Sequence, residues 1–98
     1  MVFLDYKDVL LARKKLRTDC REQLSTLEQL AAQKNYGIGG ATNGEDGFGL
    51  YIDFYYLNGR DRTFERELET TVTELLGNSF ENIPIYTRFV EPARALQN

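Results

Sequence analysis

The sequence predicts a two-layer α+β sandwich in which helices cover one face of a three-stranded sheet. Residues 48–57 alternate between two sets of side chains, with the period of two that is typical of a half-buried strand. Amphipathic segments with helical spacing lie before and after this strand. A chain of 98 residues is long enough for one domain with its own core. We therefore expect residues 1–98 to form a single domain: a helix over 5–34, a β-β-α-β unit over 35–91 and a tail over 92–98.

The first helix is expected over residues 5–34, which contain neither glycine nor proline. Asp5 or Asp8 would cap its amino end, and Gly37 would end it in the left-handed conformation. Its apolar stripe has a mean spacing of about 3.67 residues, which favours packing on a sheet or another helix over a left-handed coiled coil. The stripe consists of Val9, Ala12, Leu16, Cys20, Leu24, Leu27 and Ala31.

This helix would be longer than the sheet beneath it. A straight helix over these residues measures about 40 Å at about 1.5 Å per residue, whereas a ten-residue strand spans only about 33 Å. The first turns would therefore overhang the sheet and leave Val9, Leu10 and Leu11 in need of a partner. Together with the bare edges of a three-stranded sheet, the overhang predicts self-association, with a homodimer as the simplest form.

The middle of the chain is predicted to be a β-hairpin. A short, glycine-rich strand over residues 35–41 leads through a turn into a long strand over 48–57. One face of the long strand would carry Tyr51, Asp53 and Tyr55. The other face would carry the core-forming side chains Phe48, Leu50, Ile52, Phe54 and Tyr56.

A second helix and a last strand complete the predicted fold. The helix is expected over residues 64–76, with Thr63 as its amino-terminal cap and Gly77 at its end. The strand is expected over residues 83–91, where Pro84 lacks an amide proton and therefore suits a strand entry or edge. The helix would act as a crossover that returns this strand to the same sheet.

The composition removes several kinds of active site. The chain has no histidine, which is the usual general base at neutral pH and the commonest metal ligand. Cys20 is the only cysteine, and its place on the apolar stripe indicates a small buried hydrophobe rather than a reactive thiol. The glycines at 37, 39 and 40 lack the lysine and the following helix of a phosphate loop. We therefore predict no catalytic residue, no metal site and no cofactor.

Asp53 is the residue on which an enzymatic alternative depends. It lies between Tyr51 and Tyr55 on the less apolar face of the long strand. If this face were a pocket, Asp53 would be the first candidate for acid–base work. The other interpretation is one charge between two amphipathic rings on an exposed or partner-covered face.

A basic face is predicted on the first helix. Arg13, Arg17 and Arg21 recur every four residues, and Lys14 lies beside them. Like charges at this spacing destabilise an isolated helix by about 0.2–0.5 kcal/mol per pair. Ion pairs with the acidic second helix, an acidic protein surface or a nucleic-acid backbone could each compensate. The net charge of −3 argues against nucleic acid.

A tyrosine-rich face is predicted on the sheet. If helices cover only one side, the other side leaves Tyr51, Asp53 and Tyr55 open. Tyr86, Arg88 and Val90 from the last strand would lie beside them. Tyrosine is favoured at binding surfaces because it combines a large apolar area with a polar tip. The alternative is that the long first helix covers this face.

Residues 35–96 contain a series of short glycine and aliphatic motifs. These are Tyr36-Gly37-Ile38-Gly39, the strand from Gly47 to Leu57, Ile83-Pro84-Ile85 and Ala93-Arg94-Ala95-Leu96. The series resembles the small strand–strand–helix–strand modules that precede or accompany bacterial trypsin-like proteases. The resemblance implies an accessory role and brings no catalytic residues with it.

Together these patterns favour a non-enzymatic protein–protein interaction module, such as an adaptor, a regulator or an immunity-type inhibitor. The alternatives are a small ligand-binding domain or enzyme that uses Asp53, and a nucleic-acid binder that uses the basic helix. The longest apolar run is four residues, against about 20 for a membrane span, so we expect a soluble, cytoplasmic protein. The partner would present an acidic surface to Leu10, Leu11, Arg13, Lys14, Arg17, Arg21, Tyr51, Asp53 and Tyr55.

Overall fold

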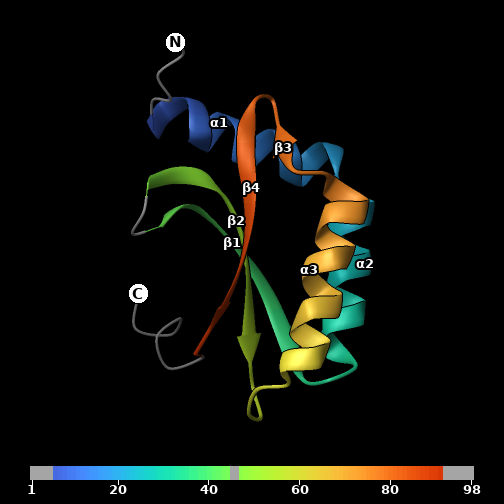
Figure 1. Ribbon diagram of the computed structural model, residues 1–98. Helices are drawn as coiled ribbons and strands as arrows, with labels where there is room; N and C mark the ends of the chain where they lie inside the picture. The colour runs from blue at the N-terminus through green and yellow to red at the C-terminus, as the bar shows by residue number, and fades with distance from the viewer. Residues whose placement is uncertain (1–5, 45–46, 92–98) are drawn as a thin grey trace.

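The structure is a computed structural model that describes residues 6–44 and 47–91, and it has an α+β fold (Figure 1). Within these described residues, no helix is long and apolar enough to cross a membrane. Its helices and strands, in chain order, are α1 (Tyr6–Asp19), α2 (Arg21–Ala32), β1 (Tyr36–Gly44), β2 (Gly47–Tyr56), α3 (Arg62–Leu76), β3 (Ser79–Phe80) and β4 (Ile83–Val90).

In the described part of the chain, the sheet has four strands in the order β1-β2-β4-β3. β1 and β2 form the predicted antiparallel hairpin, and α3 is the crossover that brings β4 parallel to β2. The predicted count of three strands is wrong, because the short β3 pairs antiparallel with β4. The turn between them is easily missed, since its two residues, Glu81 and Asn82, adopt positive φ angles of 50° and 68° without any glycine.

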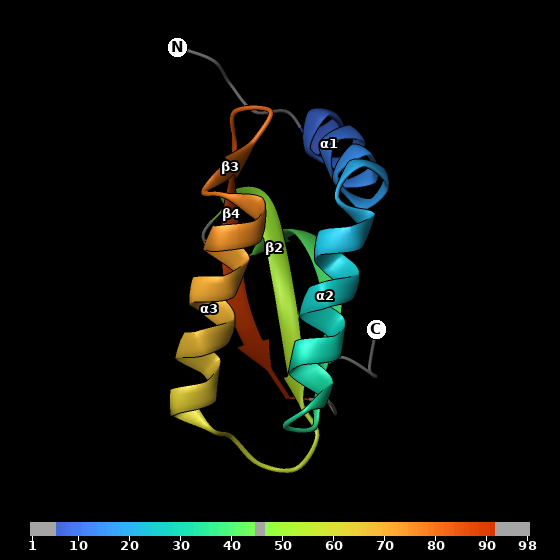
Figure 2. The same cartoon turned by 90° about the vertical axis from the view of Figure 1, so that its right-hand side faces the viewer.

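The predicted long helix is two helices that meet at a bend at Cys20, which we call the elbow. α2 lies beside α3 over one face of the sheet, while α1 lies across one end of it (Figure 2). The backbone of Cys20 leaves the helical conformation, with φ −112° and ψ 30°. Thr18 donates a side-chain hydrogen bond to the carbonyl of Lys14 at 3.2 Å, a contact that often bends helices.

The apolar stripe of the first helical region is confirmed as a core-facing stripe, although it serves two helices. Val9, Ala12 and Leu16 of α1 and Leu27 and Ala31 of α2 are all buried in the same core. Cys20 and Leu24 are partly buried against that core. The predicted overhang is wrong, because the elbow turns α1 back and Val9 becomes completely buried.

The core lies between the three helices and the apolar face of the sheet. Leu50, Ile52 and Phe54 of β2 supply the sheet side, and Phe54 and Leu68 are completely buried. α3 contributes Phe64, Leu68 and Val72 to the same core. The face of β2 that was predicted to be apolar is therefore confirmed at these positions.

Three predicted helix ends need correction or confirmation. Gly37 does not end a helix; it pairs with Tyr55 within the sheet, and Asn35 instead takes the left-handed conformation with φ 61°. The cap of α3 is Asp61 rather than Thr63, since the Asp61 side chain accepts a hydrogen bond from the Phe64 amide at 3.1 Å. Gly77 ends α3, as predicted, with φ 82°.

Some predictions fall outside the described residues. These are the Asp5 cap, the central turn residues 45 and 46, and the tail over 92–98. The last strand begins where predicted and ends at Val90, with Pro84 second in the strand.

Candidate binding site

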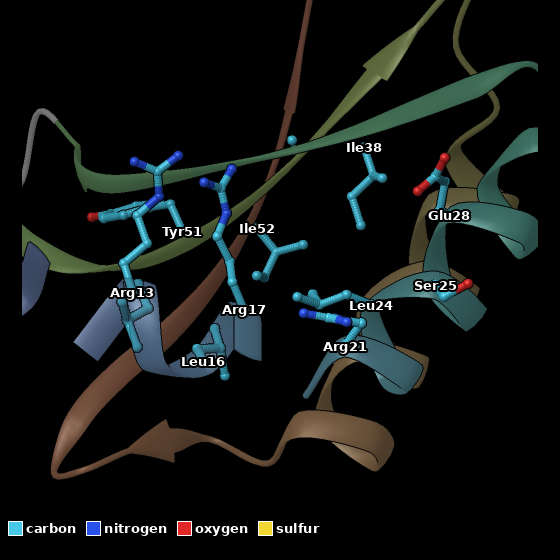
Figure 3. Close-up of a pocket in the computed structure, with 12 residues that line it drawn as sticks. Arg13, Leu16, Arg17, Arg21, Leu24, Ser25, Glu28, Ile38, Tyr51 and Ile52 are labelled. Atoms are coloured by element: carbon cyan, nitrogen blue, oxygen red, sulfur yellow. The ribbon is translucent and has the colours of Figure 1, made fainter. Parts of the chain in front are cut away.

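A pocket of about 370 Å³ lies in the elbow, between the α1–α2 bend and the strands β1 and β2 (Figure 3). We call it the elbow pocket. Its floor is apolar because the bend brings core-facing side chains of both helices opposite the edge of the sheet. These floor residues are Leu16, Leu24, Ile38, Leu50 and Ile52.

The predicted basic residues Arg13, Arg17 and Arg21 line this pocket. Their spacing of four residues places Arg13 and Arg17 on one face of α1, beside Leu16, and both guanidinium groups extend toward β1 (Figure 3). Arg21 is the first residue of α2, so the elbow brings it to the same pocket. Arg17 and Arg21 are exposed, whereas Arg13 is half-buried. The other end of the pocket is polar, with Ser25 and Glu28.

The other residues predicted for the basic helix do not line the elbow pocket. Leu10, Leu11 and Lys14 border a separate hollow of about 450 Å³ on the outer side of α1. Leu10 is 38% exposed and Leu11 is 62% exposed, so both remain available at the surface. Arg13 and Arg17 border both hollows, and the two adjoin along α1.

The tyrosine-rich face is present, and Tyr51, Asp53 and Tyr55 share it with Tyr86 and Arg88 of β4. We call these five residues the open face, although Tyr51 and Asp53 are buried within it, at 9% and 8% exposure, so the prediction that they would be open is wrong for these two. The parallel register places Tyr51 opposite Tyr86 and Asp53 opposite Arg88. The alternative that the first helix covers this face is wrong, because α1 and α2 both pack on the core side of the sheet. Tyr51 also lines the elbow pocket, so the two predicted surfaces adjoin.

Asp53 forms a two-pronged ion pair with Arg88. The Arg88 Nε and Nη2 atoms donate to Asp53 Oδ1 and Oδ2 at 2.8 and 2.9 Å. The Arg88 guanidinium also lies 4.4 Å from the centre of the Tyr51 ring, within cation–π range. Both carboxylate oxygens of Asp53 are thus engaged, which favours a role in joining β2 to β4 over a role as a free base.

Glycines allow the rings of the open face to lie flat on the sheet. A β-carbon added at Gly39 would come within 2.1 Å of the Tyr55 hydroxyl, and one at Gly49 within 2.7 Å of the Tyr86 ring. Close packing under an aromatic side chain therefore explains the glycine at position 39 of β1.

A second buried polar cluster lies at the start of α3, and sequence reasoning missed it. Glu65 is only 4% exposed. It accepts hydrogen bonds from the Tyr36 hydroxyl at 2.6 Å and from two nitrogens of Arg60 at 3.0 and 2.6 Å. The Tyr36 hydroxyl in turn accepts from the Asp61 amide at 2.8 Å. The available signal was the position of Glu65 directly after Phe64, at the border of the apolar face of α3.

The pKa shifts follow from these contacts. Burial alone would raise the pKa of Glu65, but hydrogen bonds from Arg60 and Tyr36, with the positive charge of Arg60, hold it below its ordinary value. Burial raises the pKa of the Tyr36 hydroxyl. Burial, with the nearby charge of Asp19, also raises the pKa of the Cys20 thiol, which keeps it protonated and agrees with its predicted role as a small apolar side chain.

Comparisons with known proteins identify no relative. No protein-family model matches the chain, and neither the curated proteins nor the solved structures contain a match to it. Within residues 6–44 and 47–91, no group of three or more metal-binding side chains is placed so that it could hold a metal ion.

Proposed function

We propose that this domain is a non-enzymatic binding module that docks an acidic segment of another protein in the elbow pocket. The observation that supports it is the arrangement of Arg13, Arg17 and Arg21 around an apolar floor. The open face, through Tyr51, would extend the contact onto the sheet.

The chemistry of the pocket suits a carboxylate carried next to an apolar group. A guanidinium group is a planar fork that matches the two oxygens of a carboxylate, and it is less strongly hydrated than an ammonium group. The apolar floor lowers the local dielectric constant, and this strengthens such a pair once a ligand excludes water. A partner side chain on Leu24 and Ile38 would supply the apolar part of the affinity.

Selection from a random peptide library displayed on phage would test the proposal. We expect the selected peptides to be rich in aspartate and glutamate and to contain at least one large apolar residue. Arg17→Glu combined with Arg21→Glu should weaken their binding at least ten-fold in fluorescence anisotropy. The control combines Lys34→Glu with Arg66→Glu, which makes the same change in net charge at exposed positions outside the pocket. The control should bind like the parent chain.

Two results would contradict the proposal: no enrichment of acidic peptides, or equal binding by the two double variants. A pocket of about 370 Å³ also lies in the size range of small-molecule sites. A small amphiphile with a carboxylate is therefore the second candidate. It would be favoured if native mass spectrometry found dodecanoate bound in an arginine-dependent manner while acidic peptides did not bind.

A further inference from the structure

The outer edge of β1 presents a row of backbone hydrogen-bonding groups that no strand within residues 6–44 and 47–91 uses. β1 is the first strand in the sheet order, and among the described residues it pairs only with β2. Such an edge is a template for another strand unless something blocks it. β1 contains no charged residue and no proline, the usual devices that prevent edge pairing.

The hydrogen-bond pattern identifies the groups that point outward. The Leu57 amide donates to the Asn35 carbonyl at 3.0 Å, so these two residues form a hydrogen-bonded pair. Bonded and non-bonded pairs alternate along an antiparallel ladder. Gly37 and Gly39 therefore bond to β2, whereas the amide and carbonyl groups of Ile38 and Gly40 point away from β2.

The outward-pointing residue Ile38 also supplies its side chain to the floor of the elbow pocket. Residues directly opposite each other on neighbouring strands project to the same face. The side chain of any added residue opposite Ile38 would thus enter the elbow pocket. From Ile38 toward the far end of β1, Arg17 and then Arg13 reach toward the strand (Figure 3).

We infer that the acidic segment binds as an added strand along β1, an inference that rests on the proposed function. One apolar side chain opposite Ile38 fills the pocket floor. Acidic side chains at every second residue beyond it face Arg17 and Arg13, because side chains on one face of a strand recur with a period of two. Read in the direction of β1, the partner motif is therefore apolar–any–acidic–any–acidic in an extended conformation, and an antiparallel partner strand carries the same motif in the reverse order of sequence.

Charge decides between this occupant and a second copy of the chain. Two copies joined through β1 would place an uncharged strand beside the arginines, because the strand sequence is Tyr-Gly-Ile-Gly-Gly-Ala-Thr-Asn-Gly. A second copy would bring the same cationic side chains to this edge and no additional negative charge to face them. An acidic strand provides both the backbone groups and the counter-charge.

Alternate N-methylation of the tightest-binding acidic peptide from the library tests the inference. An added strand directs every second amide toward β1. One peptide, methylated on these amides, should lose at least ten-fold in affinity, whereas the peptide methylated on the other amides should bind like the parent. In two-dimensional NMR, the unmodified peptide should slow hydrogen exchange of the Ile38 and Gly40 amides.

The outcomes separate the inference from the function on which it rests. A peptide whose binding depends on the arginines could lose affinity in both methylated forms, which would indicate that it binds as a helix. If it loses affinity in neither form, it binds through its side chains alone. Either result overturns the added strand and leaves docking in the elbow pocket intact. Dimerisation that protects Ile38 and Gly40 and excludes the peptide would also overturn it, since a second copy would then occupy the edge.

Discussion

Glu65 shows how a single charged residue can fix the junction of three segments. Its carboxylate joins α3 to Tyr36 at the start of β1 and to Arg60 in the preceding loop. A carboxylate that is almost fully buried is stable only when it is paired and hydrogen-bonded. The Tyr36 hydroxyl also accepts the Asp61 amide, so the cluster and the cap of α3 form one network.

We expect the contribution of Glu65 to stability to depend on pH. Because its folded-state pKa is lowered, the charged form favours folding; this contribution is complete above the ordinary value of 4.5 and is lost as the pH falls through the lowered pKa. Glu65→Gln should reduce the free energy of unfolding by about 1.5–3 kcal/mol at pH 7. Urea denaturation should show this difference shrinking toward pH 3.

The matched control is Glu67→Gln, an exposed position on the same helix. It should change the free energy of unfolding by less than about 0.5 kcal/mol at either pH. A pH-independent gap between Glu65→Gln and the parent chain would contradict a role for the charge itself.

At the scale of helices and strands, the elbow decides what α1 does. A straight helix would have carried the start of α1 past the sheet, whereas the bend at Cys20 lays it across one end. No glycine or proline marks the bend. The local signal is the run Thr18-Asp19-Cys20, three residues of modest helix propensity. This signal alone does not predict a bend, because the bend also depends on how the apolar stripes of α1 and α2 pack on the core.

Truncation of apolar side chains distinguishes the bent arrangement from an overhanging helix. Val9→Ala should lower the free energy of unfolding by about 2 kcal/mol, because Val9 is completely buried. Leu11→Ala, at a position 62% exposed, should cost less than about 0.5 kcal/mol. Equal and small losses, measured by chemical denaturation, would indicate that the first turns of α1 do not pack on the core.

The elements themselves were largely predictable, and their junctions were not. The alternation in β2 and the helical spacing in α3 are properties of neighbouring residues, and both elements lie close to where the sequence predicts them. The β3–β4 turn escaped because Glu81 and Asn82 adopt left-handed conformations that are usually left to glycine. The true cap, Asp61, lies two residues before the predicted Thr63, within the usual uncertainty of helix ends.

At the scale of the whole molecule, the parts of the candidate site that lie within one element were predictable, and the parts that depend on how elements meet were not. The spacing of four predicts that Arg13 and Arg17 share a face, and this is confirmed. The pocket was not predictable, because it needs the elbow and the β1 edge, which are far apart in sequence. The pairing of Asp53 with Arg88 depends on the register of two strands 35 residues apart, which local patterns do not encode.

The charge distribution of the whole chain leads to a prediction about salt. Residues 1–36 carry a net charge of +2 and residues 37–98 a net charge of −5, so an acidic ligand must be attracted by the local field of α1. Raising the salt concentration from about 50 mM to about 200 mM should reduce the affinity of the domain for acidic peptides by a factor of about three or more. The salt dependence should be smaller for the combined Arg17→Glu and Arg21→Glu variant, and anisotropy titrations would measure both.

The order of the strands indicates where partial unfolding of the sheet should begin. Each outer strand is joined to its neighbour through a local hairpin, whereas the central β2–β4 contact closes a long stretch of chain. Forming such a contact costs more loop-closure entropy than forming either hairpin. The β2–β4 contact, which the Asp53–Arg88 ion pair stabilises, is therefore the weakest junction of the sheet. Partial unfolding should begin by separating β2 from β4, while the β1–β2 and β3–β4 pairs remain intact.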